Sequence, residues 1–254
     1  MTIVMSALTP GGIVMAGEGR AILAEKEDLC DGFRNPKLNH GLLTDNEEKV
    51  FLIADKFGLM YSGPDSNDQG WCLRNEITEF DRIVRLNLRS NLSFNVLDAG
   101  EILNEFIKKA LPPEMGYSFY WAGYSPRTKK PFQVFYRDGQ EATKETRVPR
   151  GFRMDIPGYP DGCYEFGMAM SGVTEVIKEF IGDKVIRWGT MPLRDAIECV
   201  EFLVTVGIKG IKFFEGYQQL SGGDIDILVI TPTFSGFVKH KTLSLFGGGV
   251  NVGA

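Results

Sequence analysis

The second residue of the chain, Thr2, combines two groups that can perform nucleophilic chemistry. An initiator methionine ahead of a small residue is commonly removed, so we expect Met1 to leave and Thr2 to begin the mature chain. Its hydroxyl would then share a residue with a free α-amine, whose unperturbed pKa of about 8 lies closer to neutrality than that of a lysine. The amine can take the hydroxyl proton, directly or through water, while the oxygen attacks a carbonyl carbon.

This chemistry needs further groups around the threonine. A cation would keep the amine neutral and lower the pKa of the hydroxyl, a carboxylate would hold that cation, and a backbone N–H would bind the oxyanion. Other catalytic motifs are missing from the sequence, including HExxH, GxSxG and glycine-rich phosphate loops. The two histidines, His40 and His240, are expected on the surface, and the four cysteines lack the spacing of a metal site. We therefore expect neither a metal nor a cofactor.

The composition excludes several classes of protein. With 254 residues, 43% hydrophobic and 24% charged, the chain can bury a real core. A net charge of −5 gives no electrostatic basis for binding nucleic acid or an anionic membrane surface. The N-terminal stretch is uncharged as far as Glu18, but it has no early Lys or Arg, and Thr9-Pro10-Gly11-Gly12 divides it into pieces too short for a signal peptide or a membrane span. We expect a cytoplasmic protein.

Two hairpins are predicted in the first quarter of the chain. Apolar, β-rich segments at 3–8 and 13–16 flank the proline-glycine turn. A second pair at 50–54 and 58–62 is almost continuously apolar, as in strands that are covered on both faces. The intervening residues 24–48 are charged and rich in turn formers, which is typical of a loop.

Helical periodicity follows, and then strands and helices alternate again. Apolar residues recur every three or four positions, which predicts helices around 77–88 and 103–111, the second ended by Pro112-Pro113. The later expected elements are strands at 117–124, 132–136 and 164–170, a helix through 173–180, a longer helix opened by Thr190 and Pro192 that runs to 211, and strands at 226–231 and 236–243. Two strand blocks, each followed by a helix pair, predict an α+β fold, a four-layer α-β-β-α sandwich in a single domain at 1–246 with a glycine-rich tail at 247–254.

Four blocks of the sequence follow one another in an order known from one protein family. They are Thr2-Ile3-Val4 with Val14-Met15-Ala16-Gly17-Glu18-Gly19-Arg20; Lys49-Val50-Phe51-Leu52-Ile53-Ala54-Asp55 continuing to Gly63; Met170-Ser171-Gly172; and Leu220-Ser221-Gly222-Gly223-Asp224. Together they resemble proteasome β-type subunits and their bacterial relatives, the N-terminal-nucleophile hydrolases. The resemblance spans nearly the whole chain, and the fold of that family is the sandwich predicted above.

The resemblance implies a role for each matching residue. Thr2 would be the nucleophile and, through its amine, the general base. Glu18 stands where the family has an acid, usually Asp, and would hold Lys49, which tunes the threonine. The N–H of Gly63 would receive the oxyanion. The implied reaction is hydrolysis of a peptide bond through an ester-linked acyl-enzyme.

Two serines and three pocket residues complete the implied site. Ser171 and Ser221 would form hydrogen bonds around the amine of the threonine. Ala21, Tyr61 and Asp65 lie where the family lines its first specificity pocket. A bulky tyrosine there favours a small or shallow side chain at the cleaved residue.

The chain departs from the family pattern in three ways. Gln218 stands where many members have a second supporting Asp, which removes a charge near the amine. The segments 21–48 and 138–162 are longer than in the family, which predicts either specialised substrate access or enlarged surface loops. Pro64 follows Gly63 and restricts that glycine to extended geometry.

The family also implies how the protein would be assembled and used. Its members enclose their sites, so we expect a homo-oligomeric ring that acts on peptides or unfolded proteins, with the identity of any ATPase or regulatory partner left open. Two alternatives remain. A catalytically inactive structural subunit is favoured by Gln218 and the long loops but opposed by the retention of Thr2, Glu18 and Lys49. An acyltransferase or transpeptidase would pass the acyl group to another amine instead of water.

Overall fold

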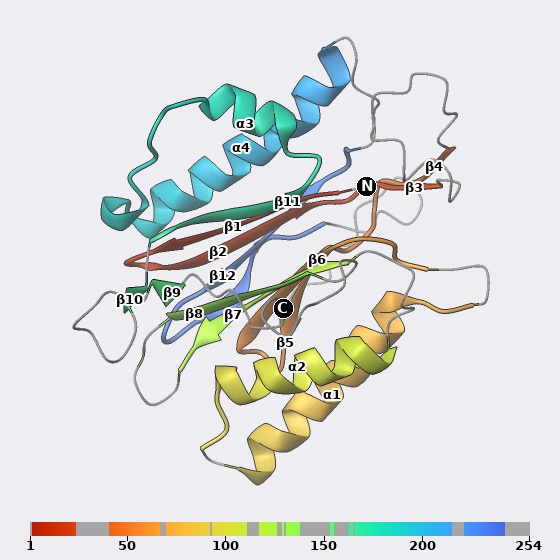
Figure 1. The fold of residues 1–254 in the computed structure, drawn as a ribbon, viewed down its shortest axis with the longest axis vertical. Helices are drawn as coiled ribbons and strands as arrows, with labels where there is room; N and C mark the ends of the chain where they lie inside the picture. The colour runs from red at the N-terminus through yellow and green to blue at the C-terminus, as the bar shows by residue number, and fades with distance from the viewer. Residues whose placement is uncertain are drawn as a thin grey trace.

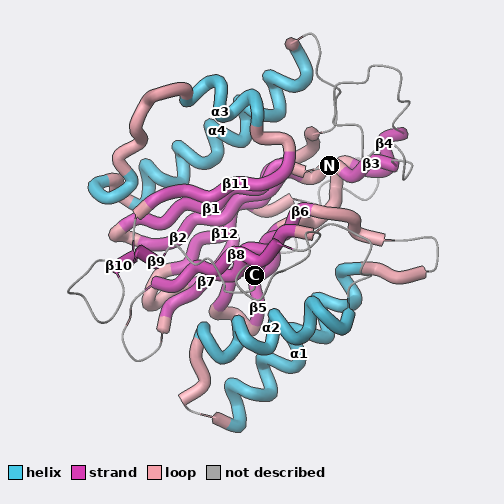
Figure 2. Tube along the Cα trace, viewed as in Figure 1, coloured by secondary structure: helices cyan, strands magenta, loops and turns pink. Residues whose placement is uncertain are grey.

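The fold is built from two antiparallel sheets and two pairs of helices. The computed structural model of the protein describes residues 2–23, 41–66, 70–91, 93–110, 117–125, 129, 131–137, 153–154, 163–164, 166–214 and 221–241. Within these ranges the protein has a mixed α+β fold, with one sheet of five strands, one of four strands and two short two-stranded ladders. The four α-helices of these ranges lie outside the strands (Figure 2).

The five-stranded sheet contains the N-terminal strand in an interior position, between two other strands. Its order is β11-β1-β2-β12-β13, with bounds Gly167–Gly172, Ile3–Thr9, Gly12–Glu18, Ile225–Ile230 and Ser235–Lys239. The predicted first hairpin is confirmed, and both of its strands run further than expected, because Thr9 pairs with Gly12 and the end of β2 pairs with β12. All residues of β1 and β2 are buried, which explains why this part of the sequence has no charge before Glu18.

The four-stranded sheet contains the second predicted hairpin. Its order is β5-β6-β7-β8, with bounds Val50–Ile53, Phe57–Ser62, Ser118–Tyr124 and Pro131–Arg137. Between β5 and β6 the chain turns through Ala54 and Asp55, which both adopt positive φ angles. This tight turn keeps β5 shorter than the expected strand at 50–54.

Four short strands correct the expected element boundaries. They are β3 at Ala21–Leu23, β4 at Gly41–Thr44, β9 at Arg153–Met154 and β10 at Cys163–Tyr164. The loop expected at 24–48 thus contains a strand, since β4 pairs with β3. The single strand expected at 164–170 is two strands, because Tyr164 pairs with Arg153 whereas the residues from Gly167 onward pair with β1.

The helix pairs cover opposite sides of the two sheets. Their bounds are Leu73–Ser90 for α1, Val96–Ala110 for α2, Glu175–Ile181 for α3 and Leu193–Phe213 for α4, with a short 3-10 turn at Trp188–Thr190. Figure 1 shows α3 and α4 beside the five-stranded sheet and α1 and α2 beside the four-stranded sheet. The prediction that Thr190 opens α4 is wrong, because Thr190 belongs to the 3-10 turn and Pro192 occupies the N-cap position.

Three buried clusters fill the spaces between these elements. An aromatic cluster that includes Phe80 and Trp121 joins α1 and α2 to the four-stranded sheet. A mainly aliphatic cluster that includes Val200 joins α3 and α4 to the five-stranded sheet. The third lies between the sheets and includes Met15 from one and Met60 from the other. The two sheets therefore pack against each other through their inner faces.

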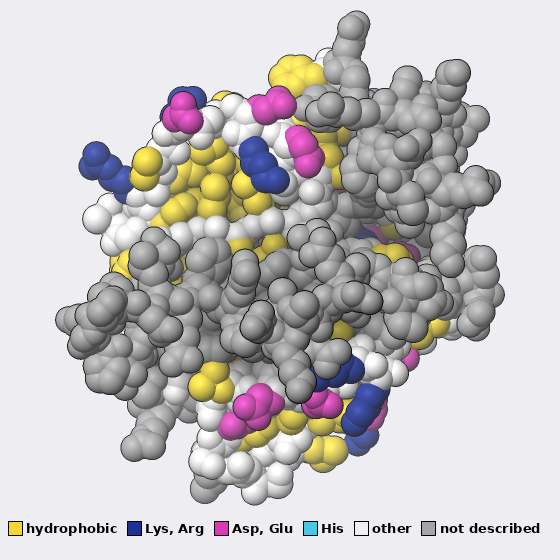
Figure 3. Space-filling model, in the orientation of Figure 1, with side chains coloured by type: hydrophobic (Ala, Val, Ile, Leu, Met, Phe, Trp, Pro, Cys, Tyr) yellow, Lys and Arg dark blue, Asp and Glu magenta, His cyan; other side chains and the backbone are white. Residues whose placement is uncertain are grey.

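The helices and the molecular surface add further observations. None of the helices in the described part of the chain has the length and apolar character that crossing a bilayer requires. Figure 3 shows hydrophobic side chains gathered on one face, over β11 and the adjoining helices. Phe180 and Phe202 stay largely exposed while their rings meet edge to face at 5.5 Å. The tail at 247–254 and most of the expanded segment 138–162 lie outside the described residues.

Candidate active site

Strand alternation directs the Thr2 side chain into the space between the two sheets. Successive side chains of a strand point to opposite faces. Val4 and Leu8 belong to the cluster between the sheets, whereas Ile3 and Met5 belong to the cluster under α3 and α4. Thr2 has the parity of Val4 and is only 1% exposed. Its Oγ1 has no hydrogen-bond partner among the described residues, so the hydroxyl is buried and uncommitted.

The peptide group that follows Thr2 is fixed from two sides. Its carbonyl oxygen accepts a hydrogen bond from Val173 N–H at 2.9 Å, and its N–H, which belongs to Ile3, donates to Glu18 Oε1 at 3.1 Å. Gly172 crosses directly behind this group with a φ of 91°, and a Cβ there would overlap the Thr2 carbonyl oxygen. The main chain at Thr2 is thus held firmly by β11 and by the end of β2.

The Glu18 carboxylate is occupied by backbone donors. Besides Ile3 N–H, it accepts hydrogen bonds at 2.8 Å from the N–H groups of Arg20 and Gly222. The carboxylate is completely buried, and burial raises the pKa of Glu18, while these N–H groups and the charge of Lys49 act in the opposite direction. Among the described residues the ion pairs do not include one between Glu18 and Lys49. Glu18 acts on Lys49 through its charge and ties three backbone segments together.

Lys49 directly precedes β5 of the four-stranded sheet, and the start of its side chain meets the five-stranded sheet on the side that Thr2 shares with Val4. Its Cβ packs on Gly17, where any side chain would come within 3.0 Å of it, and Gly17 pairs with Val4 in the ladder. The side chain is only 2% exposed, and Nζ donates to Tyr61 Oη at 3.3 Å. Burial lowers the pKa of the Lys49 ammonium, opposed by the carboxylates of Glu47, Asp65 and Glu18.

Tyr61 connects Lys49 to an acidic neighbour. Its ring is buried between Phe51 and Phe119, and its hydroxyl donates to Glu47 Oε1 at 3.3 Å. Burial, reinforced by the nearby carboxylates, raises the pKa of the tyrosine well above its usual value. The structure therefore uses Tyr61 as a support for Lys49, and its expected contact with substrate stays a prediction, as do those of Ala21 and Asp65.

The two expected serines approach Thr2 from different segments. Ser171 in β11 pairs with Val4, so it shares the inner face with Thr2 and lies diagonally across the ladder from it. Ser221 is buried, and its hydroxyl has no hydrogen-bond partner among the described residues. It directly precedes Gly222, which holds Glu18. Both serines are thus brought to the Thr2 end of the five-stranded sheet.

Four other expected features are less closely defined. Gly63 directly follows β6, and the hydrogen bonds between described residues do not use its N–H. Its role toward an oxyanion stays a prediction, as does the effect of Pro64. Met1 and Gln218 lie outside the described residues.

Sequence reasoning missed a second pair of buried charges at this end of the sheet. Asp226 of β12 is completely buried, and its Oδ2 faces Lys241 Nζ at 2.7 Å. Asp226 pairs with Gly17 in the ladder, so it points to the side of the five-stranded sheet on which Lys49 Cβ packs. One signal was available, because an acid interrupts the apolar run Ile225-Asp226-Ile227-Leu228, but nothing in the sequence identifies its partner.

The site contains groups for proton transfer and nucleophilic attack. In the part of the chain that the structure describes, no three His, Cys, Asp or Glu side chains are grouped so that they could hold a metal ion. The arrangement instead brings a buried hydroxyl, a buried ammonium and buried carboxylates to one end of the space between the sheets. No model of a known protein family matches the chain, and no curated protein matches its sequence.

Proposed function

We propose that the protein is a threonine-type peptidase of the N-terminal-nucleophile class, with Thr2 as its nucleophile once Met1 has been removed. The observation that carries this proposal is the buried Thr2 hydroxyl, which has no hydrogen-bond partner among the described residues and has the parity of Val4, on the side of the sheet where the stem of the buried Lys49 packs on Gly17. A buried polar group without a hydrogen bond is costly and is normally avoided. A nucleophilic hydroxyl must be free of other hydrogen bonds and near a group that accepts its proton, which here would be the α-amine of Thr2.

The reaction would begin with proton transfer between two groups of the same residue. The α-amine of Thr2 takes the hydroxyl proton as Oγ1 attacks the carbonyl carbon of the substrate, which gives a tetrahedral oxyanion. The oxyanion accepts a hydrogen bond from a backbone N–H, for which Gly63 is the candidate. The C–N bond then breaks, the amine returns the proton to the leaving nitrogen, and an ester on Oγ1 remains.

Water would complete the cycle by attacking the ester. The amine again accepts a proton, the ester C–O bond breaks, and Oγ1 regains its hydrogen as the acid product leaves. Lys49 would supply positive charge throughout, which favours the neutral amine and the developing alkoxide. Burial lowers the pKa of Lys49, and the carboxylates of Glu47, Asp65 and Glu18 act against this and favour its charged form.

The fold is consistent with this proposal. The two helix pairs and two facing sheets would be the α-β-β-α sandwich of N-terminal-nucleophile hydrolases, and Thr2, Ser171 and Ser221 from three of the sequence blocks lie at one end of the five-stranded sheet. A homo-oligomeric ring that admits peptides or unfolded proteins belongs to the same proposal, and native mass spectrometry tests it directly. A mass equal to one chain would remove the ring from the proposal without affecting the chemistry at Thr2.

The test of the chemistry is covalent labelling of Thr2. Intact mass first establishes that Met1 is absent from the purified protein. A β-lactone should then add its full mass to one site, located at Thr2 by peptide mapping. Thr2→Ala should take up no label, whereas Thr2→Ser, which keeps a hydroxyl, should still react.

Ser6 provides a matched control for this test. It lies in β1, which directly follows Thr2, and has the same parity as Thr2, and its buried hydroxyl also has no hydrogen-bond partner among the described residues. Ser6→Ala should label at the rate of the wild-type protein. A correctly processed wild-type protein that takes up no label would refute the proposed peptidase and favour a non-catalytic subunit.

A further inference from the structure

The Asp226–Lys241 pair is the most deeply buried ion pair among the described residues. Asp226 is fully buried and the Lys241 side chain is 6% exposed. Oδ2 makes the ion contact with Lys241 Nζ but has no hydrogen bond of good geometry among the described residues, whereas Oδ1 accepts the Lys241 backbone N–H at 2.8 Å and lies 3.0 Å from His240 Nδ1. Buried ion pairs contribute little net stability compared with apolar residues of similar volume. This pair therefore calls for a role other than stability.

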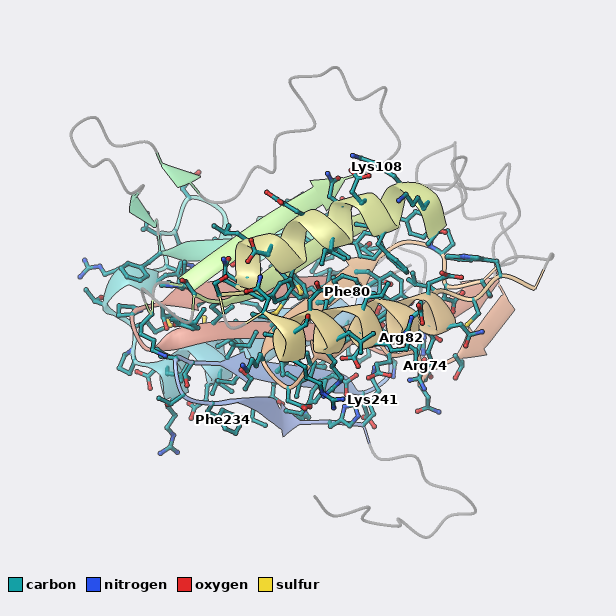
Figure 4. All side chains as sticks on the ribbon, turned by 90° about the horizontal axis from the view of Figure 1, so that it is seen from below. Arg74, Phe80, Arg82, Lys108, Phe234 and Lys241 are labelled. Atoms are coloured by element: carbon teal, nitrogen blue, oxygen red, sulfur yellow. The ribbon has the colours of Figure 1, made fainter. Side chains whose placement is uncertain are left out.

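The Lys241 ammonium reaches beyond Asp226 to a second segment of the chain. Nζ also donates to the carbonyl oxygen of Glu47 at 2.5 Å. Figure 4 shows Lys241 at the end of the last hairpin, opposite Phe234 at its turn. The ammonium thus links the end of β13 and the strand β12 to the residues that lead into β5.

Glu47 connects Lys241 to the candidate site through two hydrogen bonds. Its N–H donates to Gly19 O at 2.7 Å, which fixes the turn directly after Glu18. Its carboxylate accepts the Tyr61 hydroxyl at 3.3 Å, and Tyr61 in turn accepts the Lys49 ammonium at the same distance. A shift of Glu47 would therefore move both the Glu18 turn and the tyrosine that orients Lys49.

Gly19 leaves room for the lysine that makes this link. A Cβ at Gly19 would overlap the carbonyl oxygen of Asp45 and would lie 2.7 Å from Lys241 Cε. The small residue beside Glu18 thus allows the Lys241 side chain to pass over the turn. This contact is independent of the hydrogen bonds, and it also places the Lys241 side chain against the turn that follows Glu18.

We infer that the Asp226–Lys241 ion pair is a positioning element, which fixes the segment from Glu47 to Lys49 and so directs the Lys49 ammonium along the face that carries Thr2. The inference rests on the proposed function of Thr2. Neither member of the pair would touch the substrate. They act through Glu47 and Tyr61.

The pair also contributes to the charge balance at Lys49. The charged and titratable groups that act on Lys49 are the carboxylates of Glu47, Asp65 and Glu18, the Tyr61 hydroxyl and the ammonium of Lys241. Burial is the largest cause that lowers the pKa of Lys49, and the Lys241 charge adds to it. Removing that charge should raise the pKa of Lys49, a change that a purely structural role would not predict.

The experiment compares Lys241→Met and Lys241→Arg in the full chain. Two quantities are measured on each: the rate of Thr2 acylation by a β-lactone between pH 6 and 10, and the titration of Lys49 by NMR of lysine labelled with ¹³C at Cε. Lys241→Met should slow acylation by about tenfold to a hundredfold, and both the acylation profile and the Lys49 titration should shift to higher pH. Lys241→Arg should restore the rate to within about threefold of wild type, because it keeps the charge and both acceptors.

Controls separate this inference from folding and from the proposed function. Lys239→Met removes a half-exposed lysine two residues away that pairs with Glu201, and it should change neither quantity. If unpaired Asp226 prevents Lys241→Met from folding, Asp226→Asn combined with Lys241→Met removes both charges and should show the same shifts. If wild-type Thr2 is not acylated, the proposed function fails, yet the Lys49 titration still tests the coupling. A folded variant with the wild-type acylation profile and Lys49 titration would overturn the inference.

Discussion

The space between the two sheets has two ends of opposite character. At one end Leu8, Ile13 and Ile230 belong to one buried apolar cluster. At the other end, along the same strands, Thr2 and Lys49 are buried just as completely. The same sheets therefore enclose an apolar core at one end and a charged cluster at the other. Stability is expected to come from the first and reactivity from the second.

A glycine makes room at each end. A Cβ at Gly58 would overlap Met15 Sδ and lie 2.7 Å from Ile230 Cδ1. A Cβ at Gly17 would lie 3.0 Å from Lys49 Cβ. At the apolar end Gly58 leaves space for hydrophobic side chains. At the polar end Gly17 leaves space for the aliphatic part of the Lys49 side chain, whose ammonium lies at its far end. Close packing of the stem is what keeps the charge in place.

Lys49→Met should produce the largest effect at the polar end. Methionine keeps most of the apolar stem but removes the ammonium, so we expect Thr2 acylation to fall by about a thousandfold. Global stability should not fall, because a buried charge is removed together with its desolvation cost. The rate of β-lactone labelling and urea unfolding measure the two effects. Lys56→Met, at an exposed lysine in the β5–β6 turn, is the control, and equal rates for both variants would refute this role of Lys49.

Met15→Ala should show the opposite behaviour at the apolar end. Met15 is fully buried between the sheets, so truncation should cost about 3 kcal/mol of unfolding free energy through lost burial and a residual cavity. The folded variant should still acylate Thr2 at a rate close to that of wild type. Urea unfolding and labelling at low temperature check both expectations. A large loss of labelling in a fully folded variant would show that the two ends are not separable.

Substitutions at the two glycines should have smaller effects and should also differ between the two ends. Gly58→Ala should destabilise the protein by about 2 kcal/mol, because Met15 and Ile230 must move away. Gly17→Ala should reduce the unfolding free energy less, because the new Cβ would lie 3.0 Å from its nearest neighbours and a small shift relieves this contact. It should slow acylation, because the neighbour that moves is Lys49. The pair of variants is compared by unfolding midpoint and labelling rate. The prediction fails if Gly58→Ala slows labelling more than Gly17→Ala does.

The smallest effect is a pH dependence that comes from Glu18. Burial raises its pKa above the ordinary value of 4.5, so the native state keeps the proton at pH values where the unfolded chain has released it. The contribution of this group to stability is therefore fully present below pH 4.5 and is lost as the pH rises through the raised native pKa.

Glu18→Gln cannot titrate, so it isolates this contribution. The amide will be less stable at every pH, because it offers one oxygen to three N–H donors, but its stability should lack the decline. Urea unfolding from about pH 4.5 to 7.5 should show wild type losing stability relative to the variant as the pH rises. A difference that stays constant, or that grows in favour of wild type, would contradict the raised pKa.

The sequence predicted the elements well where local pattern decides them. The first hairpin followed from a proline-glycine turn between apolar runs, and α1, α2 and α4 from their apolar period. The errors arose where the boundaries of an element depend on which distant segment it pairs with. Tyr164 and Gly167 are close in the chain but pair with different strands, and Thr190 has the chemistry of a helix cap but lies in a separate turn.

The candidate site was predictable only in part, for a related reason. Thr2, Lys49 and Ser221 could be proposed from the resemblance, and the structure brings them to one end of the five-stranded sheet. The contacts that hold these residues in place could not be predicted from the sequence. That Glu18 binds backbone N–H groups, and that Lys241 supports Glu47 over 194 residues of sequence, depends on strand register and sheet order. No local pattern encodes either one.

The fixed peptide group after Thr2 has a consequence for the freedom of the nucleophile. With that peptide plane held by Val173 and Glu18, the backbone contributes almost no variation to the threonine. The amine nitrogen and Oγ1 are both attached to the Cα–Cβ unit, so their separation is set by a single torsion, χ1. A β-branched side chain restricts χ1 to few staggered positions. Base and nucleophile are thus aligned by choosing one rotamer, and little conformational entropy remains to be lost when the substrate arrives.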